Sequence, residues 1–517
     1  MHKEVTVEHA IGQHLMIGIQ GTELDETFID LVKKYKIGNV ILKKRNIVKK
    51  EQVQKLCASI RDLIKQETGS EPIIAISEEG GTFSNLPNDV AHIPGAMALA
   101  ATGDVGNAYT AGRVLAHELS ALGITSNLGP VLDIHSNKTN VATHVRSYSD
   151  KPETVAEFTS SMIQGLTDGN ILSMCTTFPG SGDTEANSKT GLPLLGKSRE
   201  EWAACEIVPF LAAITRKCPG IVVGHISFPA IDAQQSPASI SHTIITKLLR
   251  GELHYDGLVC TQCLQQDEIA HHYGTVHAAV HALRAGSDII QLSESYQIIP
   301  EVVQALTESY QTSYLHWEEN VYSLNRIFSI KQKFSYNPSS TSSVDSDEHR
   351  GVARAIMDRA LSTGNRPQAE LPDLGENPLF IGFHPFLSNQ EESTVSSCPP
   401  FPVWMSQHIG GKYVITPEDP DNSDIISLLE ETKGASAIVI GTYNGYAKKG
   451  QLALANAMAG TGLPTLVVAL GNPYDILYLA ENIFSFAAFD YTSLSFESVR
   501  CVLVKERTAT GILPIHW

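Results

Sequence analysis

The chain has 517 residues, of which 42% are hydrophobic and 18% are charged, and its formal net charge at pH 7 is -18. This composition excludes a disordered or fibrous chain, and at about 100–200 residues per domain it predicts two or three globular domains, with two as the simplest count. The negative charge and the lack of a basic stripe oppose binding to nucleic acid or to anionic membranes, because both need clustered cations.

Short apolar runs alternate with stretches of helical period up to about residue 335, which is the pattern of βα units with a parallel sheet. Apolar residues at three- and four-residue spacing predict outer helices, among them 105–122, 153–166, 199–215 and 276–285. Eight strands are the number that closes a (β/α)8 TIM-type barrel, and we predict this fold for residues 1–335. The expected strands are 15–19, 39–43, 73–77, 128–134, 171–175, 221–225, 258–262 and 288–292.

The segment 336–348 is polar and Ser-rich without an apolar period, so it is predicted to be a linker. Residues 349–517 again alternate buried-strand patterns with helical patterns, which predicts an α/β domain in the form of an αβα sandwich. Its expected strands are 379–383, 412–415, 437–440, 465–469 and 485–489.

The sequence shows none of the patterns typical of targeting, membrane-spanning or cofactor-binding segments. The first nine residues contain no apolar targeting segment, and no stretch approaches the roughly 18 consecutive apolar residues of a membrane span, so we expect a cytoplasmic protein. The eight cysteines lack metal-ligand spacing, and we expect reduced thiols and no metal site. Because nucleotide loops and haem motifs are also missing, we expect no cofactor. The oligomeric state stays open.

Functional residues of such a barrel lie where its strands end at the C-terminal face, so the expected strand ends identify candidates for a pocket. These candidates are Lys43, Lys44, Ser77, Glu78, Glu79, Asp133, His135, Thr176, Thr177, His225, Gln262, Cys263 and Glu294.

Short motifs follow one another along the chain: 129–134 (Gly-Pro-Val-Leu-Asp-Ile), 146–148 (Arg-Ser-Tyr), 178–180 (Phe-Pro-Gly), 182–184 (Gly-Asp-Thr), 224–226 (Gly-His-Ile), 237–241 (Pro-Ala-Ser-Ile-Ser) and 472–476 (Asn-Pro-Tyr-Asp-Ile). In content and order they resemble the motifs of glycoside hydrolase family 3, especially its β-N-acetylglucosaminidase branch and the fungal members of that branch. The resemblance covers both predicted domains and implies the same fold.

The resemblance also implies a retaining glycosidase, which needs a carboxylate nucleophile and an acid/base group about 5–5.5 Å apart. The family's nucleophile is an aspartate after Thr or Ser at the end of the seventh strand, but here Thr261 is followed by Gln262. The acid/base of this branch is a histidine paired with an aspartate, and the matching positions are Lys189 and Asn187. An amide does not form a glycosyl-enzyme at a useful rate, and a lysine with a pKa of about 10.4 is a poor proton shuttle.

Groups that grip the sugar in the family are replaced as well. Its Lys-His pair before Phe-Pro-Gly is Thr176 and Thr177, and its next histidine is Ser181. The first residue of its Asp-Gln-Glu-Gly-Gly motif is Ser77. Since nucleophile, dyad and sugar contacts fail together, ordinary retaining hydrolysis is not expected.

Several polar residues remain in the expected pocket. Asp133 and Asp183 are expected to fix loops by accepting backbone hydrogen bonds. The resemblance places Arg146 and His225 against a ligand, and the alternative is that they satisfy buried polar groups at strand ends. The predicted lining of the site is completed by Glu79, Thr177, Ser181, Lys43 and Cys263, with Cys263 expected to act mainly in packing.

Three functions stay open. The preferred one is an enzyme repurposed to a non-hydrolytic reaction on a small molecule, with Gln262 in the old nucleophile position; its acid/base candidates are Asp183, His225, Lys189 and Lys43. The second is a non-catalytic protein that binds a sugar-like ligand or a protein partner. The third is a residual β-N-acetylhexosaminidase that uses a replacement carboxylate, with Glu78, Glu79 and Asp267 as candidates. An intact pocket with ordered acid/base pairs would favour the first. A pocket closed by side chains, with its acidic residues held in structural bonds, would favour a protein-binding scaffold, and a carboxylate pair at retaining distance would favour the third.

Overall fold

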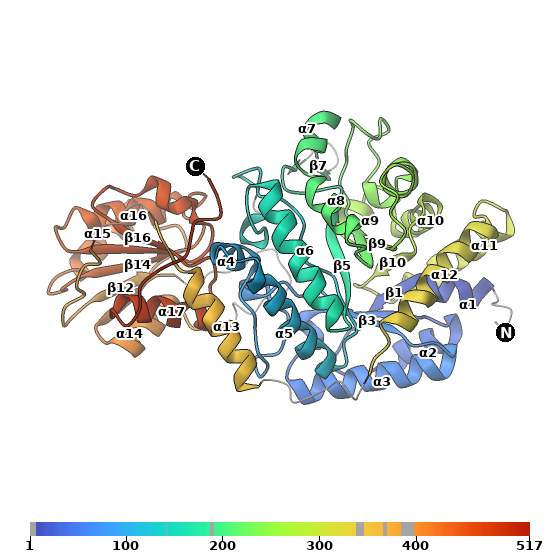
Figure 1. Ribbon diagram of the computed structural model, residues 1–517, viewed down its shortest axis with the longest axis horizontal. Coiled ribbons are helices and arrows are strands. Elements are labelled where there is room, and N and C mark those ends of the chain that lie inside the picture. The colour runs from blue at the N-terminus through green and yellow to red at the C-terminus, as the bar shows by residue number, and fades with distance from the viewer. Residues whose placement is uncertain are drawn as a thin grey trace.

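Two lobes of α/β structure lie side by side along the long axis of the molecule (Figure 1). The structure is a computed structural model that describes residues 7–140, 142–186, 191–337, 346–364, 370–383 and 398–516. Residues 338–345 of the predicted linker lie outside the described residues, so the exact domain boundary stays a prediction.

Eight parallel strands close a barrel in the order β1-β10-β9-β8-β5-β4-β3-β2. Helices cover the outside and side chains fill the interior, which is why these strands read as continuous apolar runs in the sequence. The predicted (β/α)8 barrel is confirmed. Its strands are β1 (Leu15–Gly18), β2 (Asn39–Leu42), β3 (Ile73–Ile76), β4 (Ser126–Asn127), β5 (Leu172–Phe178), β8 (Gly220–Val223), β9 (Leu258–Cys263) and β10 (Ile289–Leu292).

The helices of the first lobe pack around this barrel (Figure 1). Ile327 of α12 and the nearby Phe334 pack against residues of the barrel strands such as Met16 and Val222. The helices are α1 (Val7–His14), α2 (Glu26–Tyr35), α3 (Lys50–Thr68), α4 (Ala96–Ala101), α5 (Gly106–Leu122), α6 (Pro152–Asp168), α7 (Arg199–Ala204), α8 (Val208–Thr215), the π-helix η5 (Thr243–Glu252), α9 (Asp267–Ala270), α10 (Thr275–Ala285), α11 (Ile299–Gln311) and α12 (Trp317–Lys333).

Two predicted elements of the barrel were placed wrongly. The fourth strand is β4 (Ser126–Asn127) and not 128–134, which makes only an isolated bridge between Val131 and Thr176. Leu132 and Ile134 are buried all the same, so burial alone produced the strand-like pattern. The predicted helix 199–215 is broken into α7 and α8, because Cys205 leaves the helical region with φ -131° and ψ -85°.

The second lobe is built on a six-stranded sheet with the order β11-β16-β15-β14-β12-β13, in which only β11 is antiparallel to its neighbour. Helices α14 (Phe401–Ile409) and α17 (Ser493–Leu503) pack on one face, and α15 (Asn422–Glu431) and α16 (Lys449–Ala459) on the other. The predicted αβα sandwich is confirmed. The strands are β11 (Ser362–Thr363), β12 (Leu379–Gly382), β13 (Lys412–Ile415), β14 (Ile438–Thr442), β15 (Thr465–Ala469) and β16 (Phe484–Ala487).

The two lobes are joined by direct hydrogen bonds. Asp490, three residues beyond β16, accepts from the backbone N–H groups of Thr82 at 3.1 Å and Gly95 at 3.0 Å. Gly81 makes this approach possible, because its φ is +53° and a Cβ there would lie 2.0 Å from an Asp490 oxygen. Helix α13 (Asp347–Ala360) also lies along this seam and packs against α4, α5 and α17 (Figure 1).

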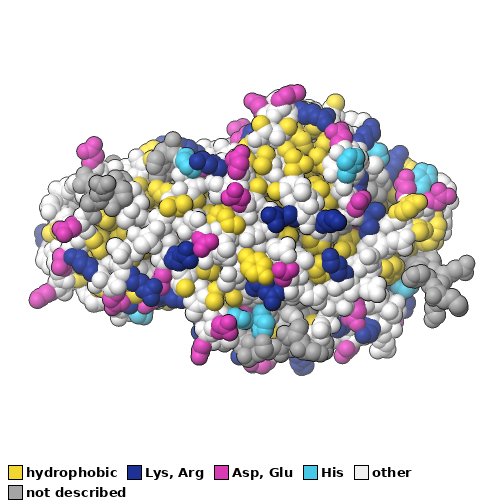
Figure 2. Space-filling view, in the orientation of Figure 1, with side chains coloured by type: hydrophobic (Ala, Val, Ile, Leu, Met, Phe, Trp, Pro, Cys, Tyr) yellow, Lys and Arg dark blue, Asp and Glu magenta, His cyan; other side chains and the backbone are white. Residues whose placement is uncertain are grey.

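The surface carries charges of both signs. On the face drawn in Figure 2, Lys and Arg side chains are interspersed with Asp and Glu side chains. Among the described residues, no helix combines the length and the apolar character needed to cross a bilayer.

Candidate active site

The predicted site residues gather where strands of the barrel end. Gln262 and Cys263 are the last two residues of β9, and His225 lies two residues beyond β8. Thr177 lies inside β5, which continues three residues further than predicted. Its methyl group faces Gly224, where an added Cβ would lie 2.4 Å from it.

Gln262 and His225 are bonded to each other. The Gln262 Oε1 accepts from the backbone N–H of His225 at 3.2 Å. The His225 ring lies between the Ser239 hydroxyl, 2.8 Å from Nδ1, and the Cys263 carbonyl, 2.9 Å from Nε2. Because a carbonyl only accepts, Nε2 carries the proton and Nδ1 accepts from Ser239. Burial lowers the pKa of His225 to about 4, so the ring is neutral at pH 7 and both nitrogens are engaged.

Arg146 and Glu79 form a two-pronged ion pair. Arg146 Nε lies 2.7 Å from one Glu79 oxygen and Nη2 lies 2.6 Å from the other, while Nη1 donates to the Ala142 carbonyl at 2.9 Å. Burial alone would lower the pKa of Arg146, but the charge and hydrogen bonds of Glu79 raise it above its ordinary range. The cavity lined by this pair and Tyr148 holds only about 20 Å³.

Asp133 holds the loop that follows β5. Its two oxygens accept from the Ser181 backbone N–H at 2.8 Å and from the Ser181 hydroxyl at 2.7 Å. Burial raises the pKa of Asp133 to about 6, although these hydrogen bonds act in the opposite direction. The loop-fixing role expected for Asp133 is therefore present.

Glu78 fixes its own loop after β3. Its carboxylate accepts from the backbone N–H groups of Gly80 at 2.8 Å and Asn85 at 2.6 Å, and from the Ser84 hydroxyl at 3.1 Å. The residue is buried, and burial raises the pKa of Glu78 to about 7 against the effect of these donors.

Asp183 belongs to a cluster of charged residues that sequence reasoning missed. Lys197 Nζ lies 3.4 Å from Asp183 Oδ2 and 2.8 Å from Glu206 Oε1, which also accepts from the Ser136 hydroxyl at 2.9 Å. The Glu206 side chain is fully buried, and its Oε2 has no hydrogen-bond partner among the described residues. The one available signal was a carboxylate inside the largely apolar segment 206–214. Asp183 thus has an ion pair where backbone hydrogen bonds were expected.

The two remaining candidates for unusual reactivity are both engaged. Lys43 Nζ lies 3.8 Å from Glu294, which also pairs with Arg45 at 3.3 Å. The buried Cys263 Sγ accepts from the Ser293 backbone N–H at 3.3 Å and lies 3.1 Å from its hydroxyl. This agrees with the packing role expected for Cys263. Asn187 and Lys189 lie outside the described residues.

Comparison with known proteins identifies the family to which this architecture belongs. The N-terminal domain of glycosyl hydrolase family 3 matches residues 6–328. The chain belongs to glycosyl hydrolase family 3. Its sequence is 29% identical over 368 residues to beta-hexosaminidase A of Pseudoalteromonas piscicida, a stretch that spans 66% of this chain and 61% of that protein.

Solved structures of other family 3 proteins extend the similarity to the second lobe. A family 3 beta-N-acetylglucosaminidase from Paenibacillus sp. str. FPU-7 shares 30% sequence identity with a TM-score of 0.90, and the alignment covers 99% of each chain. A fungal multi-domain beta-N-acetylglucosaminidase of the family shares 28% identity with a TM-score of 0.89 over 98% of this chain and 60% of its own. The resemblance to the β-N-acetylglucosaminidase branch is thus confirmed at the level of family and fold.

Proposed function

We propose that this family 3 protein does not perform retaining glycoside hydrolysis and binds a sugar-like ligand or a protein partner without turnover. The observation that carries the proposal is Gln262 at the end of β9, where the family resemblance puts the aspartate nucleophile. Its amide oxygen is held by the His225 backbone N–H. An amide at this position lacks the negative charge that attacks an anomeric carbon.

The nearby carboxylates support the same reading. Both oxygens of Glu79 are bound by Arg146, and both oxygens of Asp133 are bound by Ser181. The Glu78 carboxylate holds its own loop through three donors. A replacement nucleophile drawn from these three would have to give up bonds inside a buried region, which costs several kcal/mol, about 1–3 per unsatisfied group. The third hypothesis, a residual hexosaminidase, therefore gains nothing from Glu78 or Glu79, and Asp267 at the start of α9 is its remaining candidate.

The second candidate function is the repurposed, non-hydrolytic enzyme, and one observation favours it. Lys197 lies between Asp183, whose side chain is 30% exposed, and the fully buried Glu206 with its unpartnered oxygen. Burial alone would lower the pKa of Lys197, but Glu206 raises it, so the ammonium stays charged at pH 7. Within this cluster the partly exposed Asp183 is the group that can exchange a proton with a ligand, while the charged Lys197 holds its carboxylate in place.

A glycosidase assay combined with a ligand titration tests the proposal. Purified protein is incubated at high concentration with 4-nitrophenyl N-acetyl-β-glucosaminide, beside Gln262→Asp, its uncharged control Gln262→Asn, and a variant that adds Asn187→Asp and Lys189→His to Gln262→Asp. We expect no release of nitrophenol by the natural protein or the Asn control, and measurable release by the triple variant.

Binding is read separately by calorimetry with N-acetylglucosamine. We expect heat of binding with the natural protein and a weaker signal with Arg146→Met, which removes the exposed part of the guanidinium from the site. Turnover by the natural protein that is lost in Glu79→Gln would overturn the proposal in favour of a residual hexosaminidase. If the natural protein gives neither turnover nor binding heat, the sugar-binding proposal fails and the repurposed enzyme, tested through Lys197→Met, takes its place.

A further inference from the structure

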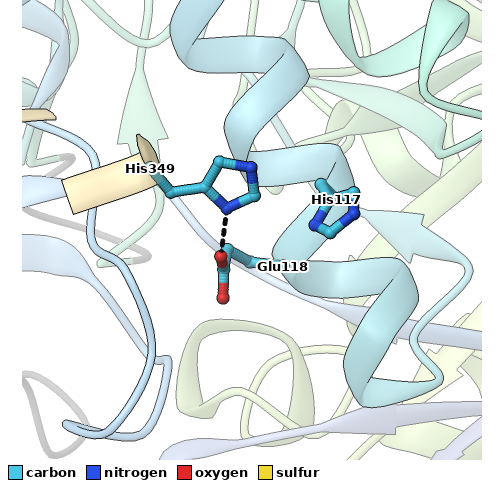
Figure 3. Close-up of side chains that lie close together, drawn as sticks. All are labelled: His117, Glu118 and His349. Atoms are coloured by element: carbon cyan, nitrogen blue, oxygen red, sulfur yellow. Dashed lines mark hydrogen bonds and ion pairs between the residues drawn. The ribbon is translucent and has the colours of Figure 1, made fainter. Parts of the chain in front are cut away.

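Two histidines and a glutamate lie close together at the seam between the lobes. His117 and Glu118 come from α5 of the barrel, and His349 comes from α13, the first helix after the predicted linker. Figure 3 shows the three side chains turned toward one another, with the His349 ring directed at the Glu118 carboxylate. One ligand atom from each residue lies within 4.8 Å of those of the other two.

The three groups lie near one another, although the present His349–Glu118 contact is shorter than the spacing between two ligands of one metal ion. His349 Nδ1 lies 2.5 Å from Glu118 Oε1, and the rings of His117 and His349 are 4.7 Å apart between centroids at an interplanar angle of 75°. Ligand atoms at about 2.0–2.2 Å from a tetrahedral zinc ion lie roughly 3.4 Å from one another. Small side-chain rotations would therefore bring the three groups from their present spacing to coordination distance.

Burial also fits a metal ligand set. The Glu118 side chain is fully buried and that of His349 is 14% exposed, so a cation there is shielded from water.

We propose that His117, Glu118 and His349 bind a divalent transition-metal ion, for which Zn²⁺ is the best match. Two imidazoles and one carboxylate suit zinc, whereas magnesium and calcium prefer oxygen donors alone. The three protein ligands leave a fourth position for water. Because the ligands come from α5 and α13, the ion ties the helix after the predicted linker to the barrel, and its function is to stabilise this junction.

A simple ion pair between Glu118 and His349 is the competing explanation, and it does not involve His117. The test uses the full chain without a histidine tag, stripped with chelator and titrated with Zn²⁺, and with Co²⁺ as a visible-light reporter of tetrahedral coordination. We expect a single tight site per chain, Co²⁺ absorption that Zn²⁺ displaces, and a rise in Tm of several degrees at about 100 times the Kd.

Variants of the ligands decide the assignment. His117→Gln and His349→Gln should each weaken Zn²⁺ binding by at least about 100-fold, because removal of a ligand exceeds the usual effect of an outer-sphere change. The matched control is His277→Ala/His281→Ala, which removes the pair of α10 rings whose centroids lie 4.0 Å apart and should leave binding unchanged. Circular dichroism of each metal-free variant must match that of the natural protein.

The proposal is wrong if the stripped protein binds no Zn²⁺, if His117→Gln retains full affinity, or if the α10 control abolishes binding. If His349→Gln lowers the Tm but added Zn²⁺ does not raise the Tm of the natural protein, the cluster is an ion pair only. Each of these results is independent of the glycosidase assay, since none involves the barrel mouth.

Discussion

The Arg146–Glu79 pair allows a sharp test of whether the carboxylates of the barrel mouth are structural. The two hydrogen bonds of 2.7 and 2.6 Å form a fork between side chains that are 27% and 11% exposed. Removal of one partner from a buried pair costs about 3–5 kcal/mol, and the partial exposure here reduces this to about 2–3 kcal/mol. Replacement of both residues should lower the free energy of unfolding by little more than replacement of one, because no charge is then left unpaired.

The experiment is a double-mutant cycle with Arg146→Met, Glu79→Gln and both together. Urea unfolding is followed by tryptophan fluorescence and far-UV circular dichroism, whose transitions must coincide for a two-state analysis. We expect a coupling free energy of about 2 kcal/mol. The control cycle uses Arg199 and Glu252, which also pair but are 51% and 50% exposed, and its coupling should stay below about 0.5 kcal/mol. A coupling for Arg146 and Glu79 as small as that of the control would refute the structural role of Glu79.

Three further predictions concern stability. Burial lowers the pKa of Lys331 to about 7, so above that pH the unfolded chain binds more protons than the folded protein. The free energy of unfolding should therefore rise by about 2 kcal/mol between pH 7 and 9. Lys331→Met should remove this rise, as measured by chemical denaturation of both proteins across this pH range. Gly81→Ala should lower the free energy of unfolding by about 2–4 kcal/mol in a thermal unfolding experiment, since the added Cβ would meet Asp490. The control Gly274→Ala, also at positive φ but in open space, should lower it by about 1 kcal/mol. Equal losses would show that the contact with Asp490 is unimportant. Burial raises the folded pKa of Asp133 to about 6, so its ionisation should destabilise the natural protein as the pH rises from about 4 to about 6. Asp133→Asn should reduce this slope by about 1.4 kcal/mol per pH unit, while Glu78 and the other buried carboxyls titrate in both proteins; parallel pH profiles would contradict the buried carboxyl.

The barrel could be predicted from the sequence because its strands are buried on both faces. Strands such as β2 and β10 are buried at every position and read as apolar runs with clear bounds. The fourth strand could not be located, since β4 has only the polar residues Ser126 and Asn127, which bond inside the barrel. The apolar residues that follow it pack elsewhere and attracted the prediction.

The site was predictable only in part, because some of its residues lie far apart along the sequence. Gln262 stands at the end of β9, so the barrel topology identifies it as a site residue. Asp133 was named from a strand that the structure does not contain, and Arg146 was named from the family motif 146–148. Lys197 and Glu206 come from the chain between two strands, where nothing local shows that they meet Asp183. His349 lies 231 residues from Glu118, and the pairing of these two depends on how α13 packs on α5.

The bonding at the barrel mouth also bears on the proposed absence of retaining hydrolysis. In a working glycosidase, polar groups at the strand ends have no protein partner, and they form their hydrogen bonds only when the sugar hydroxyls of the substrate bind. Here Gln262 is bonded to the His225 backbone, and the His225 ring is bonded to Ser239 and Cys263. The aspartate of Gln262→Asp is one methylene shorter than the glutamine, so it withdraws the acceptor from the His225 N–H and adds a charge next to a neutral, fully engaged ring. Gln262→Asp alone should therefore recover little activity, and the acid/base replacements at positions 187 and 189 are needed with it.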